Sequence, residues 1–400
     1  MQILFSGITT PIGFKAIGIS SGIKKNNQLD LALLYSDVLC NCAGVFTKNI
    51  VKGHSLELAR NNVKNGKCQA VFINSGNANA CVGPIGYDDA ISITKTISNY
   101  LKIDSNDVIT GSTGVIGYRL PMDKINTSLK YACNNLSYNG GNLASKAIMT
   151  TDTFNKEYSI KFLINDNLVT ISGMAKGSGM IQPNMATMIA ILTTDANISS
   201  KLLNKALKYV VNKSFNKISI DGDTSVCDKT LILANGLSKC EEIIDNTPQY
   251  TQFVDALLEV STELAKMITI DGEGATKLIE INVINANTQK DAELVAKAIA
   301  NSPLVKTAFF GEDANWGRLL TAAGYSGATF NPLKTEIFIG SLKLFEKGVA
   351  LTFDETKAKD ILSKKEIKVT INFNDNNYSD TVWTCDFSYD YIKINAHYRT

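Results

Sequence analysis

The segment 174–195, MAKGSGMIQPNMATMIAILTTD, constrains the fold of this chain more than any other stretch. Small and flexible residues at 176–179 are followed by a proline-containing turn, by Thr187 and at once by the apolar run 188–192. The apolar run predicts a buried strand that begins where the loop ends. A hydroxyl residue at such a junction is held rigidly, and glycines before it let the backbone approach closely, so Thr187 is a candidate nucleophile. An ordinary strand residue after a turn would give the same pattern.

Composition limits the classes of function. The 400 residues are 44% hydrophobic, which is enough for a large core, and 40 basic against 38 acidic residues leave a net charge of +2 without a basic tail. We therefore expect small molecules or copies of the chain as partners, and neither nucleic acid nor a membrane. The N-terminal sequence lacks the pattern of an export signal, and no apolar run reaches about 18 residues, so a cytoplasmic location is predicted.

Cysteine and histidine usage narrows the chemistry further. The eight cysteines are scattered, with one CxC pair and no CxxC, so reduced and mostly buried thiols are expected and a metal site is not. The chain has only two histidines, His54 and His397. Because most hydrolases and acyltransferases activate serine or cysteine with histidine, this scarcity favours a nucleophile with another base.

A chain-terminal threonine carries its own base, because its α-amine has a reference pKa of about 7.7 to 8.0. Thr187 is internal as translated. It becomes terminal if its hydroxyl attacks the carbonyl of Ala186, in an N-to-O acyl shift, and the bond between the two residues is then cut. The glycines and small residues before Thr187 permit the strained geometry that this attack requires.

Irregular alternation of strands and helices predicts a mixed α/β fold with several glycine loops converging on one site. No repeat or low-complexity linker is present, so separable domains are not indicated. Helices are expected at 88–102, 121–136, 141–149, 200–215, 251–268 and 288–301, and strands within 7–45, at 71–74, 108–110 and 188–192, after Asp271 and Glu273, and at 335–340, 367–373 and 381–387.

Two loops are candidates for site chemistry. The glycine-rich stretch 111–117, GSTGVIG, lacks the lysine of a phosphate-binding loop and the GxGxxG spacing, but backbone N–H groups at Thr113 and Gly114 would suit an oxyanion; a plain turn is the alternative. FFGEDANWGRL, 309–319, is expected to be another loop. At the C-terminus, Ile392, Ile394 and Tyr398 could pack, so the end is expected to be docked.

Ten short motifs together resemble one family, the ArgJ family of ornithine acetyltransferases, which are glutamate N-acetyltransferases. The likeness runs over essentially the whole chain. The motifs are GFKA, VFTKN, NSGNANAC, GSTGVIG, IMTTDTF, MAKGSGMIQPNMATM, DGDTS, DGEGATK, GEDANWGR and INAHYRT. Each is a weak pattern alone, but their number and order are specific.

The resemblance implies a DmpA/ArgJ-like layered sandwich of mixed α/β class, autoprocessed into an α chain, residues 1–186, and a β chain, residues 187–400. It implies an acyltransferase in which Thr187 takes the acetyl group of N-acetylornithine, releases ornithine and passes the acetyl group to glutamate in a ping-pong exchange. No cofactor is implied, acetyl-CoA is a possible second acetyl donor, and the assembly is expected to be a heterotetramer of two α and two β chains.

The resemblance also assigns site residues. It places cleavage between Ala186 and Thr187, the oxyanion hole at Thr113 and Gly114, and substrate contacts at Thr150, Lys176, Thr187, Glu273, Asn395 and Thr400. Lysine can meet a substrate carboxylate and glutamate a substrate ammonium. The family usually has an acidic residue where His397 stands. The negative charge that the family pattern implies near the substrate is therefore not supplied by this position.

Two other readings remain open. An N-terminal-threonine amidase or aminopeptidase would use the same threonine and oxyanion loop but would hand the acyl group to water. A non-catalytic metabolite-binding protein would use the glycine loops only to form a pocket, and it would not cleave itself.

Overall fold

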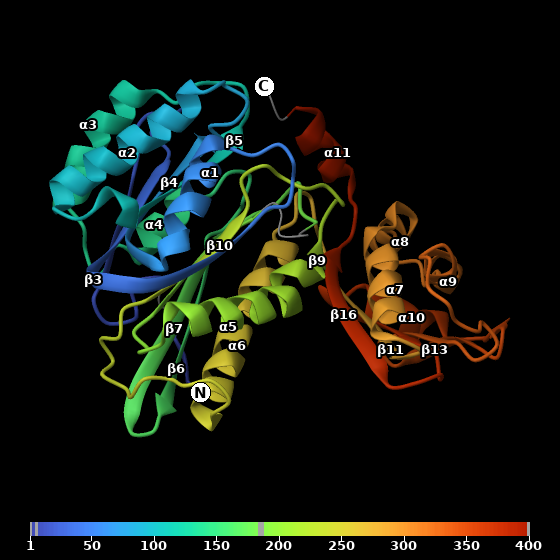
Figure 1. Cartoon of the computed structure of the whole chain (residues 1–400). Helices are drawn as coiled ribbons and strands as arrows, with labels where there is room; N and C mark the ends of the chain where they lie inside the picture. Colours follow the sequence, from blue (N-terminus) through green and yellow to red (C-terminus); the bar gives the residue numbers. More distant parts are fainter. Residues whose placement is uncertain (1, 5–6, 183–187, 398–400) are drawn as a thin grey trace. The chain divides into compact units, whose positions relative to one another are not determined.

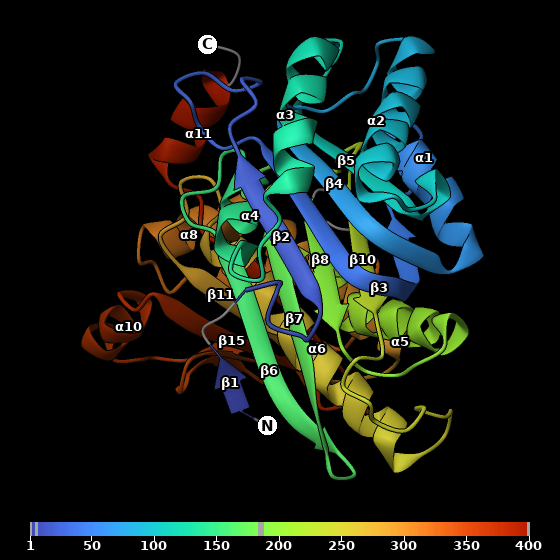
Figure 2. The same ribbon diagram turned by 90° about the vertical axis from the view of Figure 1, so that its left-hand side faces the viewer.

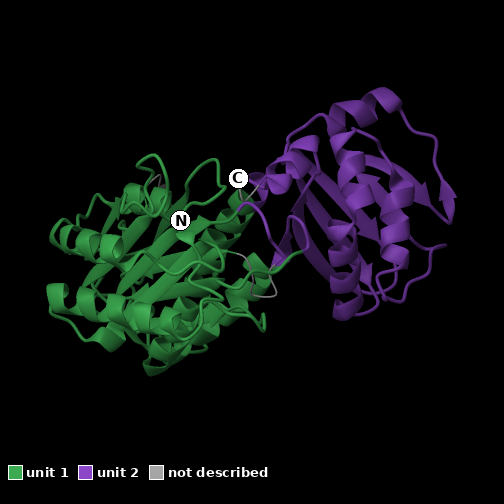
Figure 3. Cartoon of the chain, turned by 90° about the horizontal axis from the view of Figure 1, so that it is seen from above, with its two compact units in different colours: residues 1–177, 183–216, 223–268 green, residues 178–182, 217–222, 269–400 purple. Residues whose placement is uncertain are grey.

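The computed structural model describes residues 2–4, 7–182 and 188–397. The fold is mixed α/β, as predicted, and it divides into two compact units (Figure 3). Unit 1 comprises residues 1–177, 183–216 and 223–268, and unit 2 comprises residues 178–182, 217–222 and 269–400. The sequence does not indicate this division, because the chain crosses between the units several times and no single linker marks a boundary.

Unit 1 is built on a nine-stranded mixed sheet (Figure 2) with the order β1-β6-β7-β8-β10-β3-β4-β5 and with β2 paired to β3. The pairs β8/β10 and β4/β5 are parallel, and the other pairs are antiparallel. The strands are β1 (Gln2–Leu4), β2 (Phe14–Ile19), β3 (Leu31–Phe46), β4 (Lys67–Asn77), β5 (Val108–Val115), β6 (Lys156–Ile164), β7 (Asn167–Lys176), β8 (Ile189–Thr194) and β10 (Lys229–Ala234).

Helices cover the sheet of unit 1 so that both of its faces are buried (Figure 1). Along β3, Leu33 shares a buried cluster with Ile93 of α2 (Ile85–Leu101) and Leu129 of α3 (Met122–Asn134), whereas the next residue, Leu34, shares another with Ala144 of α4 (Gly141–Ala147). Because side chains alternate along a strand, a sheet covered on both faces requires nearly continuous apolar strands. The helices are α1 (His54–Asn62), α2 (Ile85–Leu101), α3 (Met122–Asn134), α4 (Gly141–Ala147), α5 (Ser200–Lys213) and α6 (Pro248–Ile270), with short 3-10 helices η1 (Val63–Asn65), η2 (Ser105–Asp107) and η3 (Phe215–Lys217).

Unit 2 is built on a seven-stranded sheet with the order β14-β13-β12-β15-β11-β16-β9, and its buried core lies between this sheet and α7, α8 and α9. The strands are β9 (Ile218–Ser219), β11 (Leu278–Ala286), β12 (Glu336–Ile339), β13 (Leu342–Glu346), β14 (Val349–Ala350), β15 (Glu366–Asn372) and β16 (Tyr378–Cys385). The helices are α7 (Gln289–Asn301), α8 (Pro303–Phe310), α9 (Trp316–Gly324), α10 (Glu355–Leu362) and α11 (Tyr389–Ala396).

The predicted helices and strands are confirmed, with three corrections. Residues 111–115 are not a loop but the end of β5, because parallel pairing with β4 extends to them. Most of 309–319 is helical, since only 311–315 separate α8 from α9. The expectation that Ile392 and Ile394 pack is wrong, because they lie on α11 with 68% and 36% of their surface exposed; Tyr398, the third residue of that expectation, lies outside the described residues.

The cysteines match the prediction of mostly buried thiols. Seven of the eight are buried and Cys81 is exposed. Burial raises the pKa of Cys40 and of Cys227 to about 12, so these two thiols are poor nucleophiles at neutral pH. Among the described residues, no helix is both long enough and apolar enough to cross a membrane.

Candidate active site

Three predicted site residues lie at the carboxyl ends of buried strands of unit 1: Thr113 and Gly114 on β5, and Lys176 on β7. Thr150 follows α4 on a loop. Such positions hold a backbone rigidly while they leave its end free to face a substrate.

The β5 end needs glycine at Gly114. Thr113 lies opposite Ser75 of β4, and Gly114 lies opposite Gly76. Gly114 has φ of +131°, and a Cβ added to it would lie 2.4 Å from the carbonyl carbon of Gly76. Only glycine satisfies both the backbone conformation and the close approach.

A buried hydrogen-bond network fixes this part of the sheet. The Ser112 hydroxyl donates to Asn74 Oδ1 at 2.7 Å and lies 2.8 Å from the Ser55 hydroxyl, and Asn74 Nδ2 donates to the Asn77 carbonyl at 2.8 Å. Asn79 Nδ2 donates to the Ser55 hydroxyl at 3.0 Å. The asparagine-rich stretch 74–81, which is the end of β4 and the loop after it, therefore supports the backbone of Thr113 and Gly114, and its polar side chains have a structural role.

Asp152 joins the loop of Thr150 to the end of β7. Its carboxylate accepts from the Thr150 N–H at 2.9 Å and from the Gly177 N–H at 2.7 Å, and it pairs with the ammonium of Lys156 at 2.7 Å. Burial alone would raise the pKa of the Asp152 carboxyl, but the charges of Lys176 and Lys156 hold it well below its usual value. Asp152 is therefore ionised, and it brings Thr150 and Lys176 into one cluster.

Lys176 is a buried cation, with 6% of its surface exposed. No hydrogen bond or ion pair joins its ammonium to any residue that the structure describes; Asp152 acts on it only as a nearby charge. Burying an unpaired charge is costly, so such a group calls for a partner. A carboxylate of a substrate would supply that partner.

Lys24 connects the Asp152 cluster to the β4 and β5 ends. Its ammonium donates to the Met149 carbonyl at 2.6 Å and to the Leu29 carbonyl at 3.0 Å, and its side chain lies against Gly76. Burial lowers the pKa of Lys24 to about 8. The charges of Asp30 and Asp152 raise this pKa, whereas the charge of Lys176 lowers it further. Thr150 and the end of β7 are thus joined through Asp152, and Lys24 links the Met149 carbonyl to Gly76, which lies opposite Gly114.

Asp228, just before β10, adds a further buried carboxyl near Lys176. Burial raises the pKa of the Asp228 carboxyl well above its usual value, against the opposing charge of Lys176. Its Oδ2 atom has no hydrogen-bond partner among the described residues.

Sequence reasoning missed Lys24, Asp152 and Asp228, because only tertiary contacts place them here. The ammonium groups of Lys24, Lys156 and Lys176 around one ionised Asp152 favour an anion.

Ala186 and Thr187, the predicted cleavage site and nucleophile, lie outside the described residues. The chain beside them is fixed in unit 1. Ile189 of β8 pairs with Lys176 of β7 on one side and with Lys229 of β10 on the other, and the Lys229 N–H donates to the Met188 carbonyl at 3.1 Å. The described chain after Thr187 therefore starts beside Lys176.

Glu273 and Asn395 come together in unit 2. Asn395 Nδ2 donates to Glu273 Oε2 at 2.8 Å, and the Glu273 side chain is buried, with 6% of the residue exposed. A Cβ on Gly179 would lie 2.3 Å from Glu273 Oε2, so this glycine lets the carboxylate lie against the backbone. Thr400 lies outside the described residues, and His397 is exposed at the end of α11.

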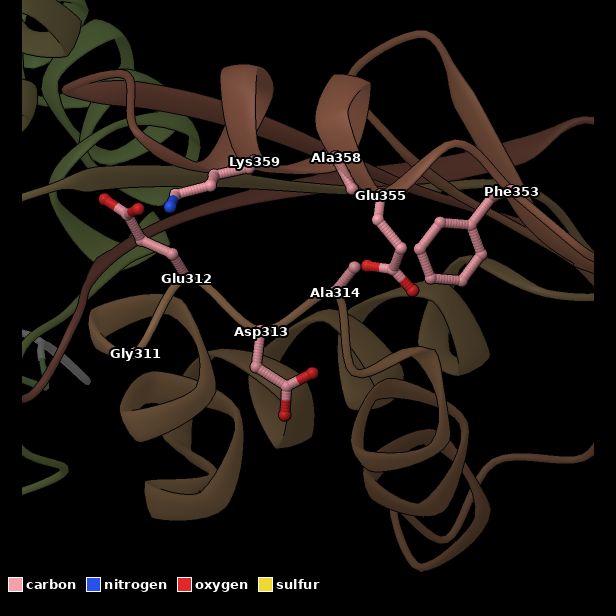
Figure 4. Close-up of a pocket in the computed structure, with 8 residues that line it drawn as sticks. All are labelled: Gly311, Glu312, Asp313, Ala314, Phe353, Glu355, Ala358 and Lys359. Carbon is pink, nitrogen blue, oxygen red and sulfur yellow. The ribbon is translucent and has the colours of Figure 1, made fainter.

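A cavity of about 470 Å³ in unit 2 contains none of the predicted site residues. In Figure 4, Glu312 and Lys359 point toward one another across it, while Asp313 points away. Glu312 also pairs with Lys277 at 3.1 Å, and Asn315 caps α9 by accepting from the Arg318 N–H at 3.0 Å. These contacts give Glu312 and Asn315 of the GEDANWGR motif structural roles. No group of residues suited to a metal ion is found in the described part of the chain.

Lys229 makes stability depend on pH. Its buried ammonium donates to the Thr110 carbonyl of β5 at 2.6 Å, and burial lowers its pKa to about 8. Between pH 8 and about 10.5 the unfolded chain therefore binds more protons at this residue, so its contribution to stability increases with pH, by at most about 1.4 kcal/mol per unit. Urea unfolding of the protein at a series of pH values should show this slope, and Lys229→Met should remove it. Equal slopes would contradict the assignment.

Comparison with known proteins identifies the family. The family model described as the ArgJ family matches residues 15–400. The chain belongs to the ArgJ family. The arginine biosynthesis bifunctional protein ArgJ of Caldanaerobacter subterraneus is 49% identical over 404 residues, and that of Symbiobacterium thermophilum is 46% identical over 402 residues, with complete coverage of both chains in each comparison. The crystal structure of ArgJ from Bacillus halodurans is 41% identical with a TM-score of 0.50, covering 51% of this chain and 96% of that one.

Proposed function

We propose that this ArgJ-family chain is an acetyltransferase of arginine biosynthesis that transfers the acetyl group of N-acetylornithine to glutamate. Membership in a family of arginine biosynthesis proteins supports the pathway. The observation that carries the proposed substrate class is the buried Lys176 ammonium, which has no partner among the described residues and lies beside the loop of Thr150. N-acetylornithine and glutamate both have an α-carboxylate that this ammonium can bind.

The proposed first step is self-cleavage. The Thr187 hydroxyl attacks the Ala186 carbonyl carbon, the bond from that carbon to the Thr187 nitrogen breaks, and the hydroxyl proton moves to the nitrogen. The product is an ester of Ala186 on Thr187 with a free α-amine. Water then hydrolyses the ester, which leaves a carboxylate on Ala186 and a free Thr187 hydroxyl beside the new amine.

Acetyl transfer follows the same logic. The Thr187 amine takes the proton of its hydroxyl, the oxygen attacks the acetyl carbonyl of N-acetylornithine, and the proton goes to the leaving nitrogen of ornithine. The amine of glutamate then attacks the acetyl carbon of the acetyl-Thr187 ester, the bond from that carbon to the Thr187 oxygen breaks, and a proton of the amine returns to this oxygen, so that N-acetylglutamate leaves and the hydroxyl is restored. Backbone N–H groups at Thr113 and Gly114 would stabilise the oxyanion of each tetrahedral intermediate.

The remaining residues would position the substrates. Lys176 would hold the α-carboxylate, and the Thr150 hydroxyl would orient the amide that is cleaved. Glu273, with its hydrogen bond from Asn395, would pair with the side-chain ammonium of ornithine. Thr400 is proposed as a further substrate contact. None of these steps needs a cofactor.

The half-length match to the Bacillus halodurans structure supports cleavage near the middle of the chain. That solved chain is 96% covered although it accounts for only 51% of this chain. This is the result expected when one chain of a cleaved pair is compared with an uncut precursor. An assembly of two α and two β chains, and a cytoplasmic location, stay predictions from the sequence.

Product analysis tests the proposed function. Purified protein incubated with N-acetylornithine and glutamate should form equal amounts of ornithine and N-acetylglutamate, followed by mass spectrometry. A second incubation, with acetyl-CoA and glutamate, decides whether acetyl-CoA is also a donor. Release of ornithine with free acetate and no N-acetylglutamate would favour the amidase reading, and no turnover of either donor would contradict the proposal.

A further inference from the structure

A short segment of the chain, residues 178–182, is inserted into unit 2. The Ser178 hydroxyl donates to the Asp271 carbonyl at 2.6 Å, and the Glu273 N–H donates to the Ser178 carbonyl at 2.9 Å. The segment thus lies along the loop that carries Glu273. It ends shortly before Ala186 in the sequence.

Asp221 holds the second half of this segment. Its carboxylate accepts from two consecutive backbone groups, the Met180 N–H at 2.6 Å and the Ile181 N–H at 2.8 Å. The Ile220 N–H also donates to the Ile181 carbonyl at 2.6 Å, and the Ile181 side chain is fully buried. The backbone of Ile181 is therefore fixed on both its donor and its acceptor side.

The conformation held in this way is not one that the chain adopts freely. Met180 has φ of +58°, in the left-handed region that favours glycine, and half of its surface is exposed, so packing does not impose this conformation. A carboxylate that accepts two charge-assisted hydrogen bonds is suited to stabilise it. Asp221 lies in the DGDTS motif, to which the proposed mechanism gives no role.

We propose that Asp221 is a positioning residue for self-cleavage, because it fixes the chain on the upstream side of the Ala186–Thr187 bond. The inference rests on the proposed function. Attack of a hydroxyl on the preceding carbonyl requires a defined approach, and a chain tethered nearby samples fewer unproductive conformations. The chain on the downstream side of this bond is held separately in unit 1, where the Lys229 N–H donates a hydrogen bond to the Met188 carbonyl.

The test compares rates of self-cleavage in the full chain. Wild type, Asp221→Asn and Asp221→Ala are made by cell-free translation, quenched at intervals and separated on denaturing gels. Asparagine keeps one acceptor oxygen and alanine keeps none. We expect cleavage to slow about 10-fold in the first variant and about 100-fold in the second, the scale expected for loss of positioning.

Asp386→Asn is the matched control. Asp386 also accepts from two consecutive backbone N–H groups of unit 2, those of Thr276 and Lys277 at 2.8 and 2.9 Å, and it is more deeply buried than Asp221. It makes none of the hydrogen bonds that hold the 178–182 segment. It should therefore cost at least as much stability as Asp221→Asn, yet cleave at the wild-type rate. Thermal melting of each variant verifies that it is folded.

The outcomes separate the two claims. Wild-type rates in both Asp221 variants, or equal slowing in Asp386→Asn, would overturn the positioning role and leave the proposed function intact. Wild-type protein that stays uncut would overturn the proposed self-cleavage, and the role of Asp221 with it. If Asp221→Ala fails to fold, the nearly isosteric Asp221→Asn decides the result alone.

Discussion

Thr187→Ala should give a single uncut chain of 400 residues with no measurable acetyl transfer. The substitution removes the oxygen that attacks the Ala186 carbonyl and that later carries the acetyl group, so both reactions lose their nucleophile. Intact-mass analysis and N-terminal sequencing measure the first effect. Wild-type protein should show a second chain that begins Thr-Met-Ile-Ala-Ile-Leu, and the variant should not.

Thr187→Ser is the control for this result, because serine keeps the hydroxyl and should still cleave, although more slowly. Loss of cleavage in both variants would point to a steric requirement and not to the hydroxyl. Thr187→Ala protein that is cut at the same bond, or that transfers acetyl groups at the wild-type rate, would contradict the whole mechanism.

Lys176→Met should lower kcat/KM for acetyl transfer by roughly 10²- to 10³-fold, the scale of losing one partner of a buried charge pair. Because both N-acetylornithine and glutamate have an α-carboxylate, the KM of each should rise. Methionine fills a similar volume, and Asp152 keeps its ion pair with Lys156, so the melting temperature should change little. Steady-state kinetics and thermal melting, measured on the same preparations, give both quantities.

The matched control for this prediction is Lys208→Met, which removes an exposed lysine of α5 and should leave the kinetics unchanged. A Lys176→Met enzyme with wild-type KM for both substrates would show that the buried ammonium does not bind their carboxylates. A large loss of stability with unchanged kinetics would instead assign Lys176 a structural role.

Local patterns predicted much of the fold, because long elements have a clear period. The apolar run 188–192 predicted β8, and the spacing of Ile93 and Ile97 predicted α2. The end of β5 was misread as a loop because its strand character comes from pairing with β4, which is distant in sequence. The division into units was missed for the same reason, since segments such as 178–182 and 217–222 are brought together only by tertiary contacts.

The candidate site was predictable to a similar degree. The glycine loops and Thr187 stand out in the sequence, and the family resemblance added Thr150, Lys176, Glu273 and Asn395. The role of Asp152 could not be read in the same way, although it stands in a visible hydroxyl-rich stretch. Its position between two backbone N–H groups and Lys156 depends on how α4, β6 and β7 pack in three dimensions.

The strands β7 and β8 lie on opposite sides of the proposed scission point, and they are neighbours in one antiparallel ladder, from Ile171 opposite Thr194 to Lys176 opposite Ile189. β8 is also paired with β10 along its full length. Hydrolysis after Ala186 would therefore cut the chain without breaking the backbone hydrogen bonds of the sheet. The two polypeptides would stay associated through the pairing of β7 with β8. The Ala186–Thr187 peptide bond would keep β7 and β8 in one chain while they fold, and it would no longer be needed once the two strands are paired.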